Sequence, residues 1–182
     1  MSDLEDWDLL NDEFGTPPAS ALSFTLNGKE VTIAHPDPSM RLVDYLRDVQ
    51  GLTGTKVCCR EGGCGACTVL LSTTSNGEKL PVNACLRHLC SMGGQSLTTI
   101  EGIGGSEQGY DPLQTAIAEG YGTQCGFCTP GMVMSIYGAL HSNSGNSGIP
   151  GGKKPCISPD EIDGSIDGNI CRCTGYRPQT QP

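Results

Sequence analysis

One stretch decides the fold of this chain: Cys59-Arg60-Glu61-Gly62-Gly63-Cys64-Gly65-Ala66-Cys67. Its three cysteines are separated by four and then by two residues, and Cys85 follows at a distance as a fourth thiol. A [2Fe–2S] cluster requires four thiolates, two on each iron. A loop that wraps a cluster also needs unusual backbone angles and a close approach of N–H groups to sulfur, and glycine allows both. We therefore predict a [2Fe–2S] cluster on Cys59, Cys64, Cys67 and Cys85.

The spacing of this loop is the plant-type ferredoxin pattern. Zinc is the main alternative, but zinc sites favour short cysteine pairs a dozen or more residues apart and lack such a density of glycine. Cys58 offers another first ligand, because five residues separate it from Cys64, whereas four separate Cys59 from Cys64. We assign Cys59 as the ligand from the spacing and interpret Cys58 as a bystander thiol.

A second cysteine set consists of Cys125-x2-Cys128 and Cys171-x-Cys173. The first pair alone fits zinc or a redox dithiol equally well. The separate second pair and the presence of another cluster motif favour a second [2Fe–2S] cluster. Thiolates placed at helix N-termini would be stabilised by the helix dipoles.

A weak internal repeat surrounds this second set. Asp111-Pro112 and Ser158-Pro159 are both helix starts, with a capping side chain before proline. The cap precedes the first cysteine by 14 residues in one unit and by 13 in the other. We expect a pseudo-twofold arrangement of four helices around one cluster, with a fourth helix that begins near Thr174 and is cut short at Pro182.

Hydrophobic periodicity indicates the remaining elements. Alternation on both sides of Asn27-Gly28 predicts a β-hairpin. Apolar residues at positions 42, 45, 46 and 49 predict an amphipathic helix over residues 39–50. Strands are expected over residues 68–72, 80–83 and 95–100, followed by helices from about residue 111 onward. The pattern indicates an α+β sheet with one helix packed on it, and then a helical half.

Composition excludes several function classes. The chain has 182 residues and a formal net charge of −9, which argues against nucleic acid and anionic membranes as partners. No stretch approaches the ~20 apolar residues that span a bilayer. Residues 1–20 are acidic, unlike a secretory signal, and are expected to form a disordered tail. We expect a reducing, cytoplasmic location, where clustered cysteines bind metal more often than they form disulfides.

Other features receive plainer interpretations. Residues 142–152 are rich in Ser, Gly and Asn and are typical of a flexible loop. Cys90 is expected to be a buried structural thiol and Cys156 an exposed one. Met132 and Met134 are expected in the core.

Several motifs resemble the iron–sulfur portion of the molybdenum hydroxylases, the xanthine dehydrogenase and aldehyde oxidase family. The resemblance covers about residues 22–178, and its motifs are Gly54-Thr55-Lys56, Glu61-Gly62-Gly63-Cys64-Gly65-Ala66-Cys67-Thr68-Val69, Val82-Asn83-Ala84-Cys85, Glu101-Gly102-Ile103-Gly104, Gln124-Cys125-Gly126-Phe127-Cys128-Thr129-Pro130-Gly131 and Gly168-Asn169-Ile170-Cys171-Arg172-Cys173-Thr174-Gly175-Tyr176-Arg177-Pro178.

The resemblance implies a β-grasp, ferredoxin-like domain over residues 21–101 and an all-α four-helix [2Fe–2S]-binding domain over residues 102–182. It implies that electrons pass one at a time from a molybdopterin site through the helical-domain cluster and then the β-grasp cluster towards a flavin. It implies that Gln124 and Cys173 touch the pterin, and that Gly62, Gly63 and Gly65 line the outer cluster on the flavin side.

The resemblance also bears on partners and on departures from the family. Molybdopterin and FAD would belong to partner domains or subunits, in a family that is typically homodimeric or multi-subunit, and this chain has no recognisable substrate site of its own. Cys58 and Arg60 stand where family members often have glycine. A cation at Arg60 would favour the reduced outer cluster. The alternatives are a zinc-stabilised structural or interaction module and a nonfunctional truncated fragment, in which the inner cluster would be the more labile.

Overall fold

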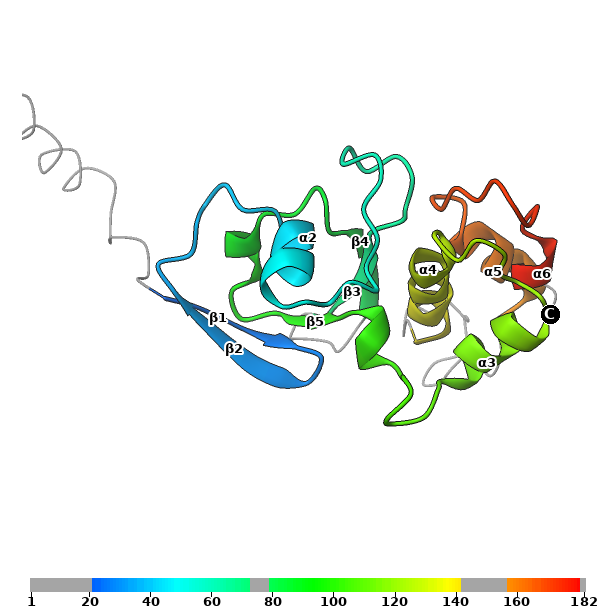
Figure 1. Ribbon diagram of the computed structural model, residues 1–182, viewed down its shortest axis with the longest axis horizontal. Helices are drawn as coiled ribbons and strands as arrows, with labels where there is room; N and C mark the ends of the chain where they lie inside the picture. Colours follow the sequence, from blue (N-terminus) through cyan, green and yellow to red (C-terminus); the bar gives the residue numbers. More distant parts are fainter. Residues whose placement is uncertain (1–20, 73–78, 142–156, 181–182) are drawn as a thin grey trace, which may run out of the picture.

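The computed structural model describes residues 21–72, 79–141 and 157–180. Within them, a five-stranded sheet with one helix against it is followed by a helical half (Figure 1). The predicted tail over residues 1–20, the loop over residues 142–152 and Cys156 lie outside the described residues. In the ranges that the structure describes, no helix has the length and apolar character needed to cross a membrane.

The predicted hairpin opens the sheet. Strands β1 (Ala21–Leu26) and β2 (Lys29–Ala34) pair antiparallel, with Leu26 opposite Lys29. The two turn residues, Asn27 and Gly28, both have positive φ, of 49° and 79°. This left-handed pair matches the right-handed twist of the strands, which is why Asn-Gly is favoured in two-residue hairpin loops.

The remaining strands complete a mixed sheet with the order β2-β1-β5-β3-β4. Strand β5 (Ser96–Thr98) runs parallel to β1 and antiparallel to β3 (Thr68–Ser72), and β4 (Lys79–Asn83) pairs with β3 at the edge. The predicted strands are therefore present, although β5 is shorter than residues 95–100. The expected α+β class is confirmed.

The helix on the sheet differs from its prediction over residues 39–50. It begins as α2 (Leu42–Asp44) and continues as a π-helical turn, η1 (Tyr45–Val49). It starts late because Arg41 is extended and forms an antiparallel bridge with His88, which keeps the preceding residues out of the helix. Val49, which was expected on the buried stripe, is 58% exposed. The π turn joins the N–H of residue 50 to the carbonyl of Tyr45, and this wider turn rotates Val49 out of the stripe.

Strand β3 is buried on both of its faces. Val69 and Leu71 lie in the core beneath α2, together with the 3-10 helix η2 (Leu89–Met92). Leu70 is equally buried but points the other way, towards Gly138 of α4. Double burial explains why this strand is a continuous apolar run instead of an alternating one.

In its described residues, the second half of the chain contains the elements η3 (Ile100–Gly102), α3 (Pro112–Glu119), α4 (Thr129–His141), α5 (Pro159–Ser165) and α6 (Arg177–Thr180). Capping boxes start both α3 and α5, and they use the predicted caps Asp111 and Ser158. The last helix begins at Arg177, three residues later than expected. Met132 and Met134 lie in the core as predicted.

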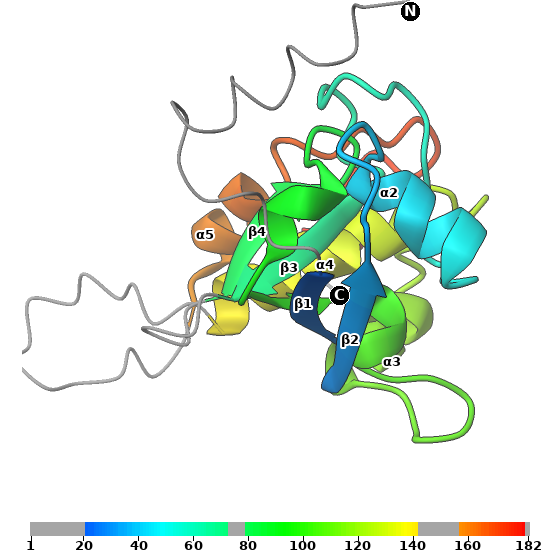
Figure 2. The ribbon, with the colours of Figure 1, turned by 90° about the vertical axis from the view of Figure 1, so that its left-hand side faces the viewer.

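The two halves meet along α4. Figures 1 and 2 both place α4 against β3 and β4, and the same elements are in contact by residue distances. A β-carbon on Gly138 would lie 2.8 Å from both Leu70 and Pro81, so helix and sheet approach as closely as a glycine allows. This contact brings the loop that carries Cys64 next to the loop that carries Cys171.

Candidate iron–sulfur sites

The outer cysteine set lies in the loop between η1 and β3 and in the segment after β4. The antiparallel pairing of β3 with β4 places Thr68 opposite Asn83, and the N–H of residue 84 donates to the Cys67 carbonyl at 3.2 Å. The strand ladder thereby carries Cys67 and Cys85 side by side, at 3% and 2% exposure. Strand geometry thus brings together two thiols that are distant in sequence.

Within the outer set, the thiols associate as two pairs. Cys64 lies close enough to Cys59 to lower its pKa, and Cys85 lies close enough to Cys67 to contribute to its raised pKa, while the Cys67 thiol donates to the side-chain carbonyl of Asn83 at 3.9 Å. The backbone N–H of Glu61, followed by the Cys64 thiol, lowers the pKa of Cys59 to about 7. Burial raises the pKa of Cys67 to about 12. Metal binding at this site must therefore displace a proton from a deeply buried thiol.

The inner set lies where the helices of the second half begin and end. Cys125 and Cys128 occupy the turn between α3 and α4, and the Cys128 carbonyl accepts the N–H of Met132 within α4. Cys171 and Cys173 lie in the loop between α5 and α6. Cys125 and Cys128 thus stand at the N-terminus of a helix, where its dipole favours anionic sulfur.

The inner thiols also form two pairs, each with one member from either loop. Cys125 raises the pKa of Cys173, and Cys171 contributes to the raised pKa of Cys128, so each pair lies close together. Burial, followed by the Cys171 contact, raises the pKa of Cys128 to about 12. Burial would also raise the pKa of Cys171, but hydrogen bonds from the hydroxyl and N–H of Thr174 lower it on balance. The pairs join the two helical units that the internal repeat predicted.

Two pairs for each set fit a cluster of two irons better than a single ion. One tetrahedral zinc, at about 2.3 Å from each sulfur, would draw all four sulfurs together. A [2Fe–2S] cluster takes two thiolates on each iron, so pairwise convergence is its expected ligand arrangement.

Arg60 occupies a backbone conformation that normally belongs to glycine. Its φ of 60° is left-handed, and the guanidinium of Arg41 donates to its carbonyl at 3.0 Å. Its own guanidinium forms an ion pair with Asp44 at 2.8 Å. The carboxylate of Asp44 therefore offsets the positive charge that Arg60 brings to this loop. Cys58, two residues before, is exposed.

The residues predicted to contact further cofactors lie in both loops. Gln124 and Cys173 are exposed. Gly62 and Gly63 are in the outer loop, with Gly62 at a φ of 78°. Gly65 is buried and faces the helical half, because a β-carbon there would lie 2.4 Å from the Gly168 carbonyl oxygen.

The sequence did not reveal the residue that joins the two loops. Asn169 is 3% exposed; its amide donates to the Gly65 carbonyl at 2.8 Å, and its carbonyl accepts the hydroxyl of Ser135 at 2.7 Å. Beside it, the N–H of Ile170 donates to the carbonyl of Cys64 at 2.9 Å. The only sequence signal was the presence of Asn169 in the motif around Cys171, which carries no information about its partner 104 residues away.

Comparisons with known proteins agree with this arrangement. Residues 24–91 match the 2Fe-2S iron-sulfur cluster binding domain, and residues 99–181 match the [2Fe-2S] binding domain. A chain of quinoline 2-oxidoreductase from Pseudomonas putida 86 is similar in structure, with a TM-score of 0.71 and 35% identity over 88% of this chain and 87% of its own. The aldehyde oxidoreductase from Desulfovibrio gigas matches with a TM-score of 0.73 and 35% identity over 88% of this chain and 16% of its own.

Sequence relatives are much longer than this chain. It is 46% identical to a xanthine dehydrogenase of Drosophila pseudoobscura pseudoobscura over 168 residues, which are 90% of this chain and 12% of the relative. It is 47% identical to aldehyde oxidase 4 of Cavia porcellus over 161 residues, 86% of this chain and 11% of the relative. Both domain matches, the sequence relatives and the structural neighbours agree, and the chain belongs to the two-cluster iron–sulfur portion of the xanthine dehydrogenase and aldehyde oxidase family.

Proposed function

We propose that this chain conducts electrons one at a time between a molybdopterin site and a flavin, both held by other domains or subunits of a molybdenum hydroxylase. Cys125, Cys128, Cys171 and Cys173 would hold the inner cluster, and Cys59, Cys64, Cys67 and Cys85 the outer one. A bound [2Fe–2S] cluster supplies a site that gains and loses single electrons. The cytoplasmic location remains a prediction from composition.

The hydrogen bond between Ile170 and Cys64 is the observation that carries this proposal. Its acceptor is the carbonyl of one proposed outer ligand, and its donor residue immediately precedes the proposed inner ligand Cys171. A path of covalent bonds interrupted by one hydrogen bond therefore runs from Cys64 to Cys171. Asn169, which is buried, holds the same junction from the side through its hydrogen bond to the Gly65 carbonyl.

Exposure of the inner loop supports a partner at that end. Cys125, Cys173 and Gln124 are exposed, and Tyr121 and Phe127 beside them are 84% and 47% exposed. Large aromatic side chains are common at interfaces, and thiolate ligands are better shielded from water there. We infer that the molybdopterin-bearing domain covers this loop, as the family resemblance implies.

Magnetic coupling between the reduced clusters tests the proposal. With both clusters reduced in the full chain, low-temperature EPR should show splitting or faster relaxation that neither single-cluster variant shows. Cys85→Ala and Cys125→Ala supply the two single-cluster references. A spectrum that equals the sum of the two references would contradict direct contact between the ligand loops.

Neighbouring cysteines provide a matched test of the outer ligand set. We expect Cys59→Ala to lose the outer cluster, because Cys59 has the ferredoxin spacing and lies close enough to Cys64 for the two thiols to interact. Cys58→Ala should retain it, because Cys58 is exposed and its spacing is one residue too long. Iron content and the ferredoxin-type EPR signal report whether each variant retains the outer cluster. Retention in Cys59→Ala together with loss in Cys58→Ala would reverse the assignment.

A further inference from the structure

We propose that the hydroxyl of Thr174 is held as a hydrogen-bond donor to the sulfur of Cys171 and thereby raises the reduction potential of the inner cluster. This inference rests on the proposed function, since it takes Cys171 as a cluster ligand. The oxygen of Thr174 lies 3.1 Å from the sulfur, and the backbone N–H of the same residue lies 3.5 Å from it. Thr174 therefore approaches one ligand sulfur through two donors.

The direction of this hydrogen bond follows from the side chain of Gln179. Gln179 is 3% exposed, and its amide nitrogen donates to the carbonyl of Gly122 at 2.6 Å. A carbonyl can only accept, so the amide nitrogen of Gln179, and not its oxygen, must face Gly122. The same nitrogen then donates its second hydrogen to the hydroxyl oxygen of Thr174 at 2.7 Å.

Both lone pairs of the Thr174 hydroxyl are occupied. One accepts the hydrogen from Gln179, and the other accepts the backbone N–H of Tyr176 at 3.2 Å. A hydroxyl has one hydrogen and two lone pairs, so only its hydrogen remains to be placed. The two acceptors in reach are the Cys171 sulfur and the carbonyl oxygen of Gln179, each at 3.1 Å. The latter belongs to the amide that already donates to Thr174, so a linear bond to the sulfur is favoured.

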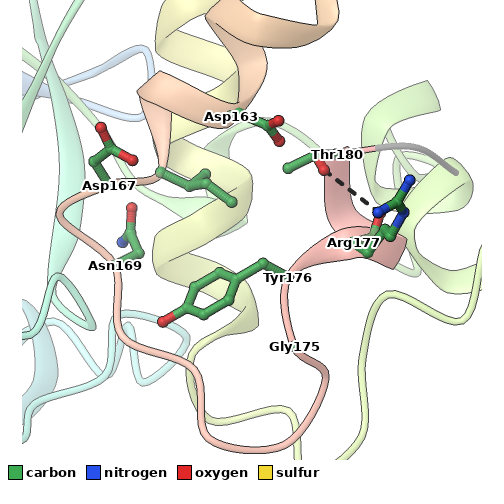
Figure 3. Close-up of a pocket in the computed structure, with 8 residues that line it drawn as sticks. Asp163, Asp167, Asn169, Gly175, Tyr176, Arg177 and Thr180 are labelled. Carbon is green, nitrogen blue, oxygen red and sulfur yellow. Dashed lines mark hydrogen bonds between the residues drawn. The ribbon is translucent and has the colours of Figure 1, made fainter.

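The same loop also holds the backbone of Cys171. The backbone N–H of Cys171 donates to the phenolic oxygen of Tyr176 at 2.9 Å. Figure 3 shows the ring of Tyr176 crossing from the start of α6 towards the segment that carries Asn169, beside a cavity of about 410 Å³. Tyr176 thus positions the backbone of Cys171, and Thr174 contacts its sulfur.

The second helical unit differs here from the first. Thr129 directly follows Cys128, as Thr174 directly follows Cys173. The hydroxyl of Thr129 lies 2.8 Å from the hydroxyl of Thr123. The repeat therefore offers two threonines in equivalent sequence positions, of which one bonds a ligand sulfur and the other bonds a second threonine.

The sign of the effect follows from charge. Reduction adds one negative charge to the cluster and its ligands, and a donor to sulfur stabilises the more negative form. A donor that is already oriented need not reorganise when the electron arrives. Loss of the hydroxyl should therefore make the inner cluster harder to reduce and leave the outer cluster unchanged.

The test is a reductive titration of the full chain followed by EPR, with Thr174→Val, Thr174→Ser and Thr129→Val. At a fixed applied potential, Thr174→Val should lower the ratio of reduced to oxidised inner cluster about tenfold, which is ~59 mV for a one-electron couple. Thr174→Ser keeps the donor and should retain the wild-type ratio, and Thr129→Val should do so as well. The outer cluster is an internal reference.

An unchanged or higher ratio in Thr174→Val would overturn the proposal, as would an equal fall in Thr129→Val. If Thr174→Val fails to hold the inner cluster, resonance Raman spectra of the wild type in H₂O and D₂O decide instead. The iron–sulfur stretch of the inner cysteine ligands should shift on deuteration, and its failure to move would overturn the proposal. Absence of both clusters from the wild type would overturn the proposed function itself.

Discussion

Replacing Cys128 by alanine is expected to remove the inner cluster and to unfold the helical half, while the sheet half stays folded. Among the described residues, the helical core has five buried apolar residues against fifteen in the sheet core. Its helices α5 and α6 have seven and four residues, too short to persist without packing. The proposed inner ligands join α3 and α4 to α5 and α6, and structural metal sites contribute on the order of 10 kcal/mol to folding.

Hydrogen exchange followed by mass spectrometry measures this outcome segment by segment. In Cys128→Ala, amides of α3, α4 and α5 should exchange rapidly, and those of β1 and β3 should stay protected. Cys67→Ala should lose the outer cluster yet keep protection in β1, because the core under α2 remains. Cys90 is exposed, so the prediction of a buried structural thiol was wrong, and Cys90→Ala should keep both clusters. Full protection of α4 in Cys128→Ala would show that the helical half folds without its metal.

Replacing Gly65 by alanine is expected to destabilise the contact between the two halves by about 2–4 kcal/mol. Its φ of 69° costs a non-glycine residue about 1 kcal/mol. The added carbon would also lie 2.4 Å from the Gly168 carbonyl oxygen and 2.6 Å from the Asn169 amide. Overpacking of this kind typically costs 1–3 kcal/mol. The bonds of Asn169 to Gly65 and of Ile170 to Cys64 would both be strained.

Gly94→Ala separates the backbone effect from the steric one. Gly94 has a nearly equal φ of 67°, and its β-carbon would meet nothing within 4 Å. We expect it to lose only about 1 kcal/mol, by thermal unfolding under identical conditions. Gly65→Ala should also weaken the magnetic coupling between the clusters, which Gly94→Ala should not. Equal stability of the two variants would show that the close approach at Gly65 is relaxed without loss.

Features with a local cause could be predicted from the sequence. The hairpin at Asn27-Gly28 and the caps Asp111 and Ser158 depend on neighbouring residues alone, and all three occur as predicted. The prediction of two [2Fe–2S]-binding domains rested on cysteine spacing and on family motifs, and the domain matches confirm it.

Features that depend on distant residues, or on a departure from α-helical geometry, could not be predicted. Val49 fits the helical stripe, but a π turn at Tyr45 removes it from the core. Leu70 reads as one more strand residue, and only the approach of α4 explains its burial. Asn169 carries no periodic or capping signal, because its hydrogen-bond partners, Gly65 and Ser135, are distant in the sequence.

Iron and acid-labile sulfide analysis of freshly prepared, anaerobically handled full chain tests the central claim most directly. Two [2Fe–2S] clusters require about four irons and about four sulfides per chain, with reductive EPR resolving two signals. A colourless chain without acid-labile sulfide, or one that carries only zinc, would contradict the account.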